Sequence, residues 1–336
     1  MKQDLYYQTK KLSFIGLTTY VVFLVVFYFL AIHNHPQNAS TFFGRFYWLI
    51  FGVISIGVVA YIVYSILKAK KRQKCIGTLC VDVYIKYSFL LQQLVARDFK
   101  SKYKRSVLGV LWSFLNPLLM MLVQYIIFST LFGNASIKCY PVYLICGVVI
   151  FNFFSESCGM GLTSIVGNAP LITKVYVPKY IYPVSRVISS MINLAFSLIP
   201  LFLIMLISGV WPSLYHLLLL IDLFLLVMFC MGLTLLLSSV MVFFRDMQFL
   251  WSVIITIWMY ATPIFYSLDM FAGGIVVSLL KFNPLYQYLT FARIVLIEGT
   301  SPALSTYVWC ILSSIIMFLI GLIVFKKTQN KFVLYI

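Results

Sequence analysis

Long apolar runs alternate with short polar segments along most of the chain. A helix needs about 20 consecutive apolar residues to cross a bilayer core of ~30 Å. Eight runs approach or exceed that length, at about 13–32, 46–67, 107–132, 141–166, 184–208, 215–243, 249–266 and 303–325. The runs are continuous rather than alternating, which favours helices over barrel strands. The pattern predicts an all-α polytopic membrane protein.

One long polar stretch, 68–105, divides the pattern. We expect residues 1–75 to form two additional N-terminal transmembrane helices. Residues 76–336 then form a six-span core.

The region 267–302 is apolar but interrupted. Gly273-Gly274 and Pro284 break helix continuity, and each piece is too short to cross. We expect two short re-entrant helices, 272–280 and 284–297, that dip into one leaflet and pack against protein.

The composition excludes a soluble protein and sets an orientation. The chain is 62% hydrophobic and 10% charged, with 25 Lys and Arg against 8 Asp and Glu. An excess of basic over acidic residues also suggests nucleic-acid binding. Here, however, the basic residues lie between apolar runs, as they do in cytoplasmic loops of membrane proteins. With the N-terminus inside, 21 of the 25 cations fall in inner segments. We predict a multi-pass membrane protein with both termini cytoplasmic and region 267–302 outside.

The stretch 83–105 has two faces at helical spacing. The basic face comprises Lys86, Gln93, Arg97, Lys100 and Lys104, and the apolar face comprises Tyr84, Tyr87, Leu91 and Leu94. We expect an interface helix in the plane of the inner membrane surface, with a plain charged linker as the alternative. Arg97 and Asp98 could also pair locally, which would make them structural.

The chain then turns into the bilayer. We expect Gly109 to permit close packing at the turn. Asn116-Pro117 would loosen the following span, because Pro117 cannot donate and its ring crowds the preceding turn. A transmembrane helix weakened in this way, next to a helix in the membrane plane, suggests a segment that moves and acts as a gate.

Four stretches carry a resemblance to a known family. They are RDFKSKYKRSVLGVLWSFLNPLL (97–119), NAPLITKVYVPKYIYP (168–183), FFRDMQFL (243–250) and the pair ATPIFY (261–266) with FNPLYQYLTFAR (282–293). In order and spacing they resemble the ABC-2-type permeases that export O-antigen, teichoic acid or capsule. The resemblance covers about 83–336.

This resemblance implies a core like that of the type V exporters, located in a bacterial cytoplasmic membrane. It also implies a homodimer of permease subunits with two separate ATPase subunits. No GxxxxGK[ST] motif and no Gly-Lys dipeptide occurs, so no phosphate-cradling loop is present. We expect this chain to hold no cofactor, and the partner ATPase to bind ATP and Mg. The cargo implied is a lipid-linked polysaccharide.

The coupling loop, defined as residues 168–183, is the predicted contact with the ATPase. It combines apolar side chains with flanking cations, a pattern typical of a docking site; the alternative is a short turn packed on the membrane. By resemblance it contains the coupling helix. The predicted contact residues are Leu171, Ile172, Lys174, Val175, Tyr176 and Pro178. Arg245 and Asp246 in the next inner loop form a secondary contact or a local ion pair.

A sugar conduit requires hydrogen-bonding groups and aromatic faces. The candidate path residues are Trp112, Tyr125, Phe151, Phe154, Glu156, Trp258, Tyr260, Phe265, Tyr266 and Arg293. For any single aromatic residue, a lipid-facing or core position is more common than a place in the path. Glu156 lies well inside a span, where a carboxylate is costly. It could pair with a nearby group such as Asn152, or stay protonated.

Three alternatives remain at this point. A membrane glycosyltransferase needs placed carboxylates or histidines, and the chain has no DxD-like pair and three histidines. An ion-driven transporter or channel usually needs several intramembrane ionisable groups. An ABC-2 exporter of another cargo, such as a drug or lipid, fits the same motifs.

Overall fold

A computed structural model describes residues 64, 67, 76–103, 108–109, 111–132, 139–175, 177–268 and 274–336. The two predicted N-terminal spans, Lys104 and Tyr176 lie outside the described residues. The chain divides into two compact units, Met1–Gln92 and Gln93–Ile336. The described part of the first unit comprises Tyr64, Leu67 and the beginning of helix α4.

The described residues are helical, with no strand among them. The longer helices are α4 (Ile76–Tyr103), α5 (Leu111–Phe132), α6 (Tyr140–Leu162), α8 (Ile181–Ile207), α9 (Leu219–Phe243), α10 (Met247–Tyr260) and α13 (Leu304–Thr328). The short ones are η1 (Val166–Asn168), α7 (Ala169–Lys174), η2 (Leu214–Leu218), α11 (Ile275–Lys281), α12 (Pro284–Arg293), η4 (Ile294–Glu298), η5 (Gln329–Lys331) and α14 (Phe332–Tyr335).

Four of the described helical segments are long and apolar enough to cross a membrane. They are Tyr140–Leu162, Ile181–Ile207, Leu214–Phe243 and Leu304–Tyr335. Shorter apolar helices occur at Phe114–Phe128 and Met247–Tyr260. The prediction of an α-helical polytopic membrane protein is confirmed at this level, and the six-span arrangement stays a prediction.

Helix α10 ends earlier than the apolar run predicted. The run extends to about residue 266, but the helix stops at Tyr260, and residues 261–268 form an irregular segment. Pro263 explains the stop, because it lacks an N–H and disfavours helix in the residue before it.

Helix α9 packs against α6, α8 and α13 and supplies much of the core of the second unit. Small residues allow the closest approach. Gly232 of α9 faces Gly321 of α13, and a Cβ at either position would overlap the backbone of the other helix. Close backbone contact of this kind drives helix association in lipid, where the hydrophobic effect contributes little.

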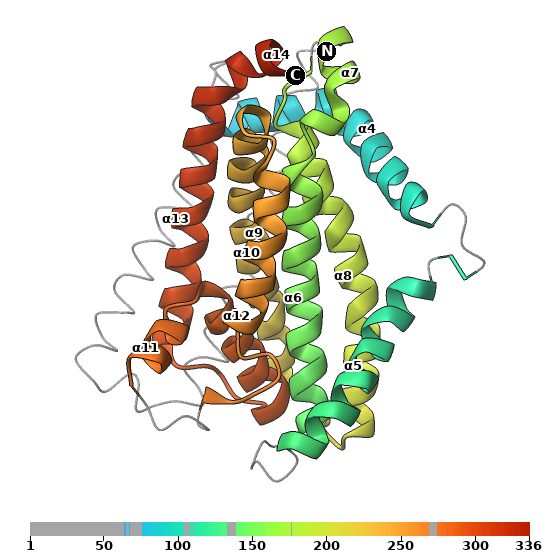
Figure 1. Ribbon diagram of the computed structural model, residues 1–336, viewed down its shortest axis with the longest axis vertical. Helices are drawn as coiled ribbons and strands as arrows, with labels where there is room; N and C mark the ends of the chain where they lie inside the picture. The colour runs from blue at the N-terminus through green and yellow to red at the C-terminus, as the bar shows by residue number, and fades with distance from the viewer. Residues whose placement is uncertain are drawn as a thin grey trace. The chain divides into compact units, whose positions relative to one another are not determined.

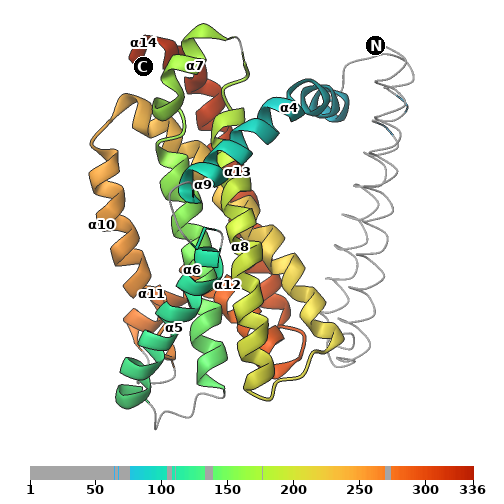
Figure 2. The same cartoon turned by 90° about the vertical axis from the view of Figure 1, so that its right-hand side faces the viewer.

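The connections alternate between the two ends of the bundle. One end of the bundle, which we call the α7 end, contains helix α7, the turn between α9 and α10, and α14 (Figure 1). Helices α11 and α12 and the segment between α8 and α9 lie at the opposite end (Figure 2). The three loops that the sequence places on one side of the membrane therefore share one end of the structure.

Gly321→Leu should separate α9 from α13. Overpacking a close helix contact costs roughly 1–3 kcal/mol, so we expect the unfolding temperature in detergent to fall by on the order of 5 °C. Gly159→Ala is the matched control, because a Cβ at Gly159 meets no atom within 4 Å. Equal thermal stability of G321L and the unaltered chain would contradict this packing.

Candidate functional site

Helix α4 shows two faces in its last three turns. Leu94, Val95 and Asp98 are buried, whereas Arg97 and Lys100 are exposed. This is the division of faces that the sequence pattern predicts for an amphipathic helix. The burial of the charged residue Asp98 among apolar neighbours is the feature that the pattern did not indicate.

The turn after α4 depends on Gly109, but not for the reason that the sequence suggested. Its φ is +52°, in the left-handed region that favours glycine, and a Cβ there would meet nothing within 4 Å. The expectation of close packing at Gly109 is therefore wrong, and backbone conformation is the reason for a glycine. Helix α5 then begins at Leu111 and continues through Pro117, beside the exposed Asn116.

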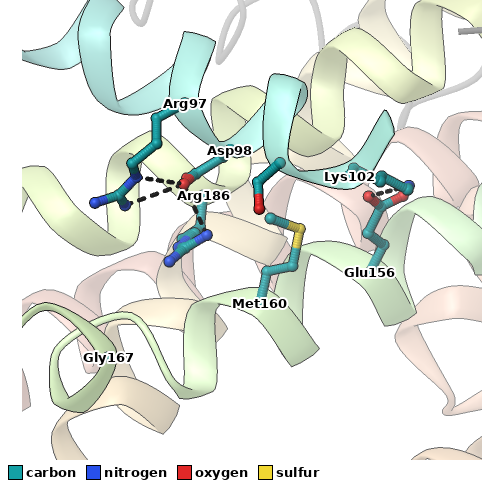
Figure 3. A pocket seen from close by; sticks show the side chains of 8 residues that line it. Arg97, Asp98, Lys102, Glu156, Met160, Gly167 and Arg186 are labelled. Atoms are coloured by element: carbon teal, nitrogen blue, oxygen red, sulfur yellow. Dashed lines mark hydrogen bonds and ion pairs between the residues drawn. The ribbon is translucent and has the colours of Figure 1, made fainter. Parts of the chain in front are cut away.

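A charged cavity of about 540 Å³ opens between α4, α6 and α8 at the α7 end. We call it the inner cavity. Its lining residues are Arg97, Asp98, Ser101, Lys102, Glu156, Met160, Gly167 and Arg186. Two groups of ion-paired side chains stand on either side, with Met160 between them (Figure 3).

Asp98 is the centre of the first group. Its Oδ1 accepts from Nε and Nη2 of Arg97, at 3.2 and 3.0 Å. The same oxygen lies 2.9 Å from Nη1 of Arg186 on α8. The Asp98 side chain is only 3% exposed and that of Arg186 19%. The local Arg97–Asp98 pair considered from the sequence therefore exists, and it extends to a second helix.

Glu156 is the centre of the second group. Its Oε1 accepts from Nζ of Lys102 at 2.7 Å and from Nδ2 of Asn193 at 2.6 Å. The partner suggested from the sequence, Asn152, is wrong, because the Asn152 side chain is exposed while the observed partners come from α4 and α8. Spacing along one helix reveals only neighbours on that helix.

The coupling loop touches the first group directly. Asn168, just before α7, is buried and donates from Nδ2 to the carbonyl of Ser164 at 2.7 Å. Its Oδ1 accepts from Nη1 of Arg97 at 3.1 Å. The amide of Asn168 thus joins the backbone of the α6–α7 connection to the side chain of Arg97 on α4.

The predicted contact residues of the coupling loop divide by exposure. Ile172 points into the protein, whereas Lys174 and Val175 are exposed; Leu171 and Pro178 are half-buried. Beyond them, Nζ of Lys179 donates to the carbonyl of Gln329 at 2.6 Å. Burial lowers the pKa of Lys179. The loop is therefore anchored on both sides and presents a small exposed surface.

The turn between α9 and α10 also presents exposed side chains at the α7 end. Arg245 and Asp246 are both exposed, and no ion pair joins them in the described part of the chain. Phe244 and Phe249 beside them are exposed apolar residues. The arrangement leaves the charges of this turn accessible.

Arg293 holds the opposite end of the bundle together. It donates from Nη1 to the carbonyl of Pro263 at 2.8 Å, and from Nη2 to that of Ile264 at 3.0 Å. Its guanidinium carbon stands 3.4 Å from the ring centre of Tyr143 on α6. Gly147 makes room, because a Cβ there would lie 3.0 Å from Nη2. The contact of Arg293 with cargo stays a prediction.

The aromatic residues proposed to line a path occupy different environments. Phe151, Phe154 and Phe265 are buried and pack against other aromatic rings. The ring centres of Phe154 and Trp258 are 4.9 Å apart. Trp258 and Tyr266 are half-buried. The exposed members are Trp112, Tyr125 and Tyr260. Only the exposed group is available to a conduit without rearrangement of the core.

Sequence reasoning missed several polar residues of the structure. The sequence analysis used Arg186 and Lys102 only as charges that indicate topology. It included Asn168 only as the first residue of the coupling loop, and it did not single out Asn193. Asp222 on α9 is fully buried, and neither carboxylate oxygen has a hydrogen-bond partner within the described residues. The available signal for Arg186 was its position just inside a span, where a cation needs a partner.

These features define a class of protein. A bundle of apolar helices, with a charged amphipathic helix and basic loops at one end, is an integral membrane protein. The chain belongs to the ABC-2 type transporter family, whose model matches residues 90–297. Members of this family are permease subunits of ABC transporters, without a catalytic site of their own.

The chain is also similar to individual permeases. It is 32% identical to the O-antigen export system permease protein RfbA of Myxococcus xanthus over 248 residues, which cover 73% of this chain and 95% of that protein. It is 31% identical to the protein of the same name from Klebsiella pneumoniae over 248 residues, with 72% and 93% covered.

Asp98→Arg should destabilise the protein, because it places a third cation beside Arg97 and Arg186. Losing one partner of a buried ion pair costs about 3 kcal/mol, so the unfolding temperature in detergent should fall clearly. The double variant D98R/R186D restores opposite charges and should recover most of the loss. A double variant no more stable than the worse single variant would show that the pair contributes nothing.

Proposed function

We propose that this chain is the transmembrane subunit of an ATP-driven exporter that moves a lipid-linked polysaccharide across the bacterial cytoplasmic membrane. The observation that carries the proposal is the similarity to two O-antigen export permeases over nearly their whole length. The family match spans α4 to η4, which includes the coupling loop and the inner cavity. Family membership supports an ABC ATPase as the partner.

In the proposed orientation the α7 end is cytoplasmic, and both termini are on the cytoplasmic side of the membrane. The distribution of Lys and Arg supports this, as does the common location of the coupling loop, the α9–α10 turn and α14 (Figure 1). An ATPase subunit then contacts the exposed surface around Lys174 and Val175. Arg245 and Asp246 provide the secondary contact.

The proposed assembly is a homodimer with two ATPase subunits. Its support is a set of exposed residues at positions inside apolar helices: Trp112 and Asn116 on α5, Asn152 on α6, and Thr256 and Tyr260 on α10. An amide facing hydrocarbon is unfavourable. A second copy would cover these residues and enclose a conduit whose walls offer hydrogen bonds and aromatic faces to sugars.

Val175→Asp should weaken association with the ATPase subunit by about tenfold or more, because it puts a charge in a contact that excludes water. Co-purification and titration binding in detergent measure this. Leu214→Asp is the matched control, since Leu214 is an exposed apolar residue at the opposite end of the bundle. Equal binding by V175D and L214D would contradict the proposed docking site.

Export itself is tested in proteoliposomes that contain this chain and its ATPase. Lipid-linked polysaccharide should stimulate ATP hydrolysis and cross the membrane only with ATP. Translocation of a drug or a simple lipid, with no response to lipid-linked polysaccharide, would contradict the proposed cargo. It would leave the membership of the ABC-2 family unaffected. Export without any ATPase subunit would overturn the proposal as a whole.

A further inference from the structure

We propose that Arg97 is the positioning residue that connects the coupling loop to the interface helix, and that the inner cavity is a latch that holds this helix closed. The inference rests on the proposed function. It goes further by naming the bonds through which a movement of α7 reaches α4. The polar chain runs from Asn168 through Arg97 and Asp98 to Arg186.

The last turns of α4 are attached to the bundle at few points. Leu94 and Val95 are buried, and the ring of Phe99 stacks on Phe196 with centres 6.1 Å apart. The polar contacts around the inner cavity, between Asp98 and Arg186 and between Lys102 and Glu156, are further attachments among the described residues. An open cavity of about 540 Å³ replaces the close packing found between α9 and α13.

The contacts of Arg97 and the Lys102–Glu156 pair can be released, whereas the Asp98–Arg186 pair is buried. The side chains of Arg97, Lys102 and Glu156 are 48%, 44% and 24% exposed, so water can replace their partners. Exposed ion pairs contribute little to stability. A helix held by apolar core packing would instead lose buried area that water cannot restore. The interface helix is therefore the element that we expect to take two positions, in contrast to the closely packed α9 and α13.

Arg97 divides its guanidinium between two elements. Nε and Nη2 donate to Asp98 on its own helix, and Nη1 donates to Asn168 at the start of the coupling loop. Asn168 is itself fixed, because its Nδ2 bonds to the carbonyl of Ser164. A displacement of α7 would therefore act on the Arg97–Asn168 bond, which joins the start of the coupling loop to α4.

Release of Arg97 also changes the surroundings of Asp98. While Arg97 is held, two guanidinium groups share the single oxygen Oδ1, and Oδ2 is buried without a partner. A carboxylate with one unsatisfied buried oxygen is poorly solvated. Movement of α4 toward water would let water molecules donate hydrogen bonds to that oxygen. This gain in solvation lowers the free energy needed to open the latch.

The first experiment is a double-mutant cycle on the Arg97–Asn168 bond. In the complex with its ATPase, R97Q, N168A and the double variant should each export about fivefold less polymer per ATP hydrolysed, the scale typical of coupling between sites. Because both changes remove the same Arg97–Asn168 bond, the loss that this bond causes should not add in the double variant. N168D retains an acceptor for Arg97 and should keep near-normal coupling.

K281Q is the control for loss of a cation, because Lys281 is an exposed residue on α11 at the opposite end. It should leave the polymer-to-ATP ratio unchanged. An unchanged ratio in R97Q and N168A, with the ATPase bound and active, would overturn the latch. A purely structural role would lower the amount of folded complex without changing this ratio.

The second experiment tests movement directly. In K102C/E156C, a short bifunctional thiol reagent should join α4 to α6, because Nζ and Oε1 of the native residues are 2.7 Å apart. Crosslinking should stop export, and reduction should restore it in the same sample; the single variants control for native cysteines. Undiminished export by crosslinked protein would overturn the latch.

The outcomes separate the two proposals. If the unaltered chain neither binds an ATPase nor exports lipid-linked polysaccharide, the proposed function fails. If it does both, and the crosslinked and R97Q proteins behave as the unaltered chain does, the function stands and only the latch fails.

Discussion

The arrangement of the α7 end depends on one carboxylate. Asp98 is buried on a helix whose neighbouring positions are basic, and burial of an unpaired carboxylate would cost several kcal/mol. Its Oδ1 therefore draws Arg97 from the same helix and Arg186 from α8 to within about 3 Å. That requirement fixes the rotation of α4 about its axis, with Leu94 and Val95 inward and Lys100 outward. It also brings Arg97 to the edge of the coupling loop, where Asn168 completes its bonds.

The second unit combines two kinds of attachment. Helices α6, α9 and α13 meet through glycines and small polar residues, so their backbones lie close and leave little freedom. Helix α4 meets the bundle across a charged, open cavity. In a transporter that must open for a polymer and close again, such a contrast is physically useful. Close packing preserves the scaffold, while contacts that water can replace allow one element to move at small cost.

The opposite end uses a cation for a different purpose. Arg293 is buried, and its three donated bonds go to backbone carbonyls of residues 143, 263 and 264. The irregular segment after α10 leaves carbonyl groups without helical partners, and a guanidinium satisfies several at once. Arginines thus close both ends of the bundle, by pairing with a carboxylate at one end and by capping exposed carbonyls at the other.

The sequence by itself determined the class of protein, the approximate positions of the apolar helices, the amphipathic character of α4 and the interrupted region before α13. Those properties follow from hydrophobic length and spacing, which are local. It also supplied the coupling loop through resemblance. Only the tertiary structure decided which charges meet, because Glu156 bonds to residues 54 and 37 positions away and Arg97 to one 71 positions away. Spacing cannot reveal such pairs. The burial of Asp98, the partners of Glu156 and the conformational reason for Gly109 all depend on how the helices pack.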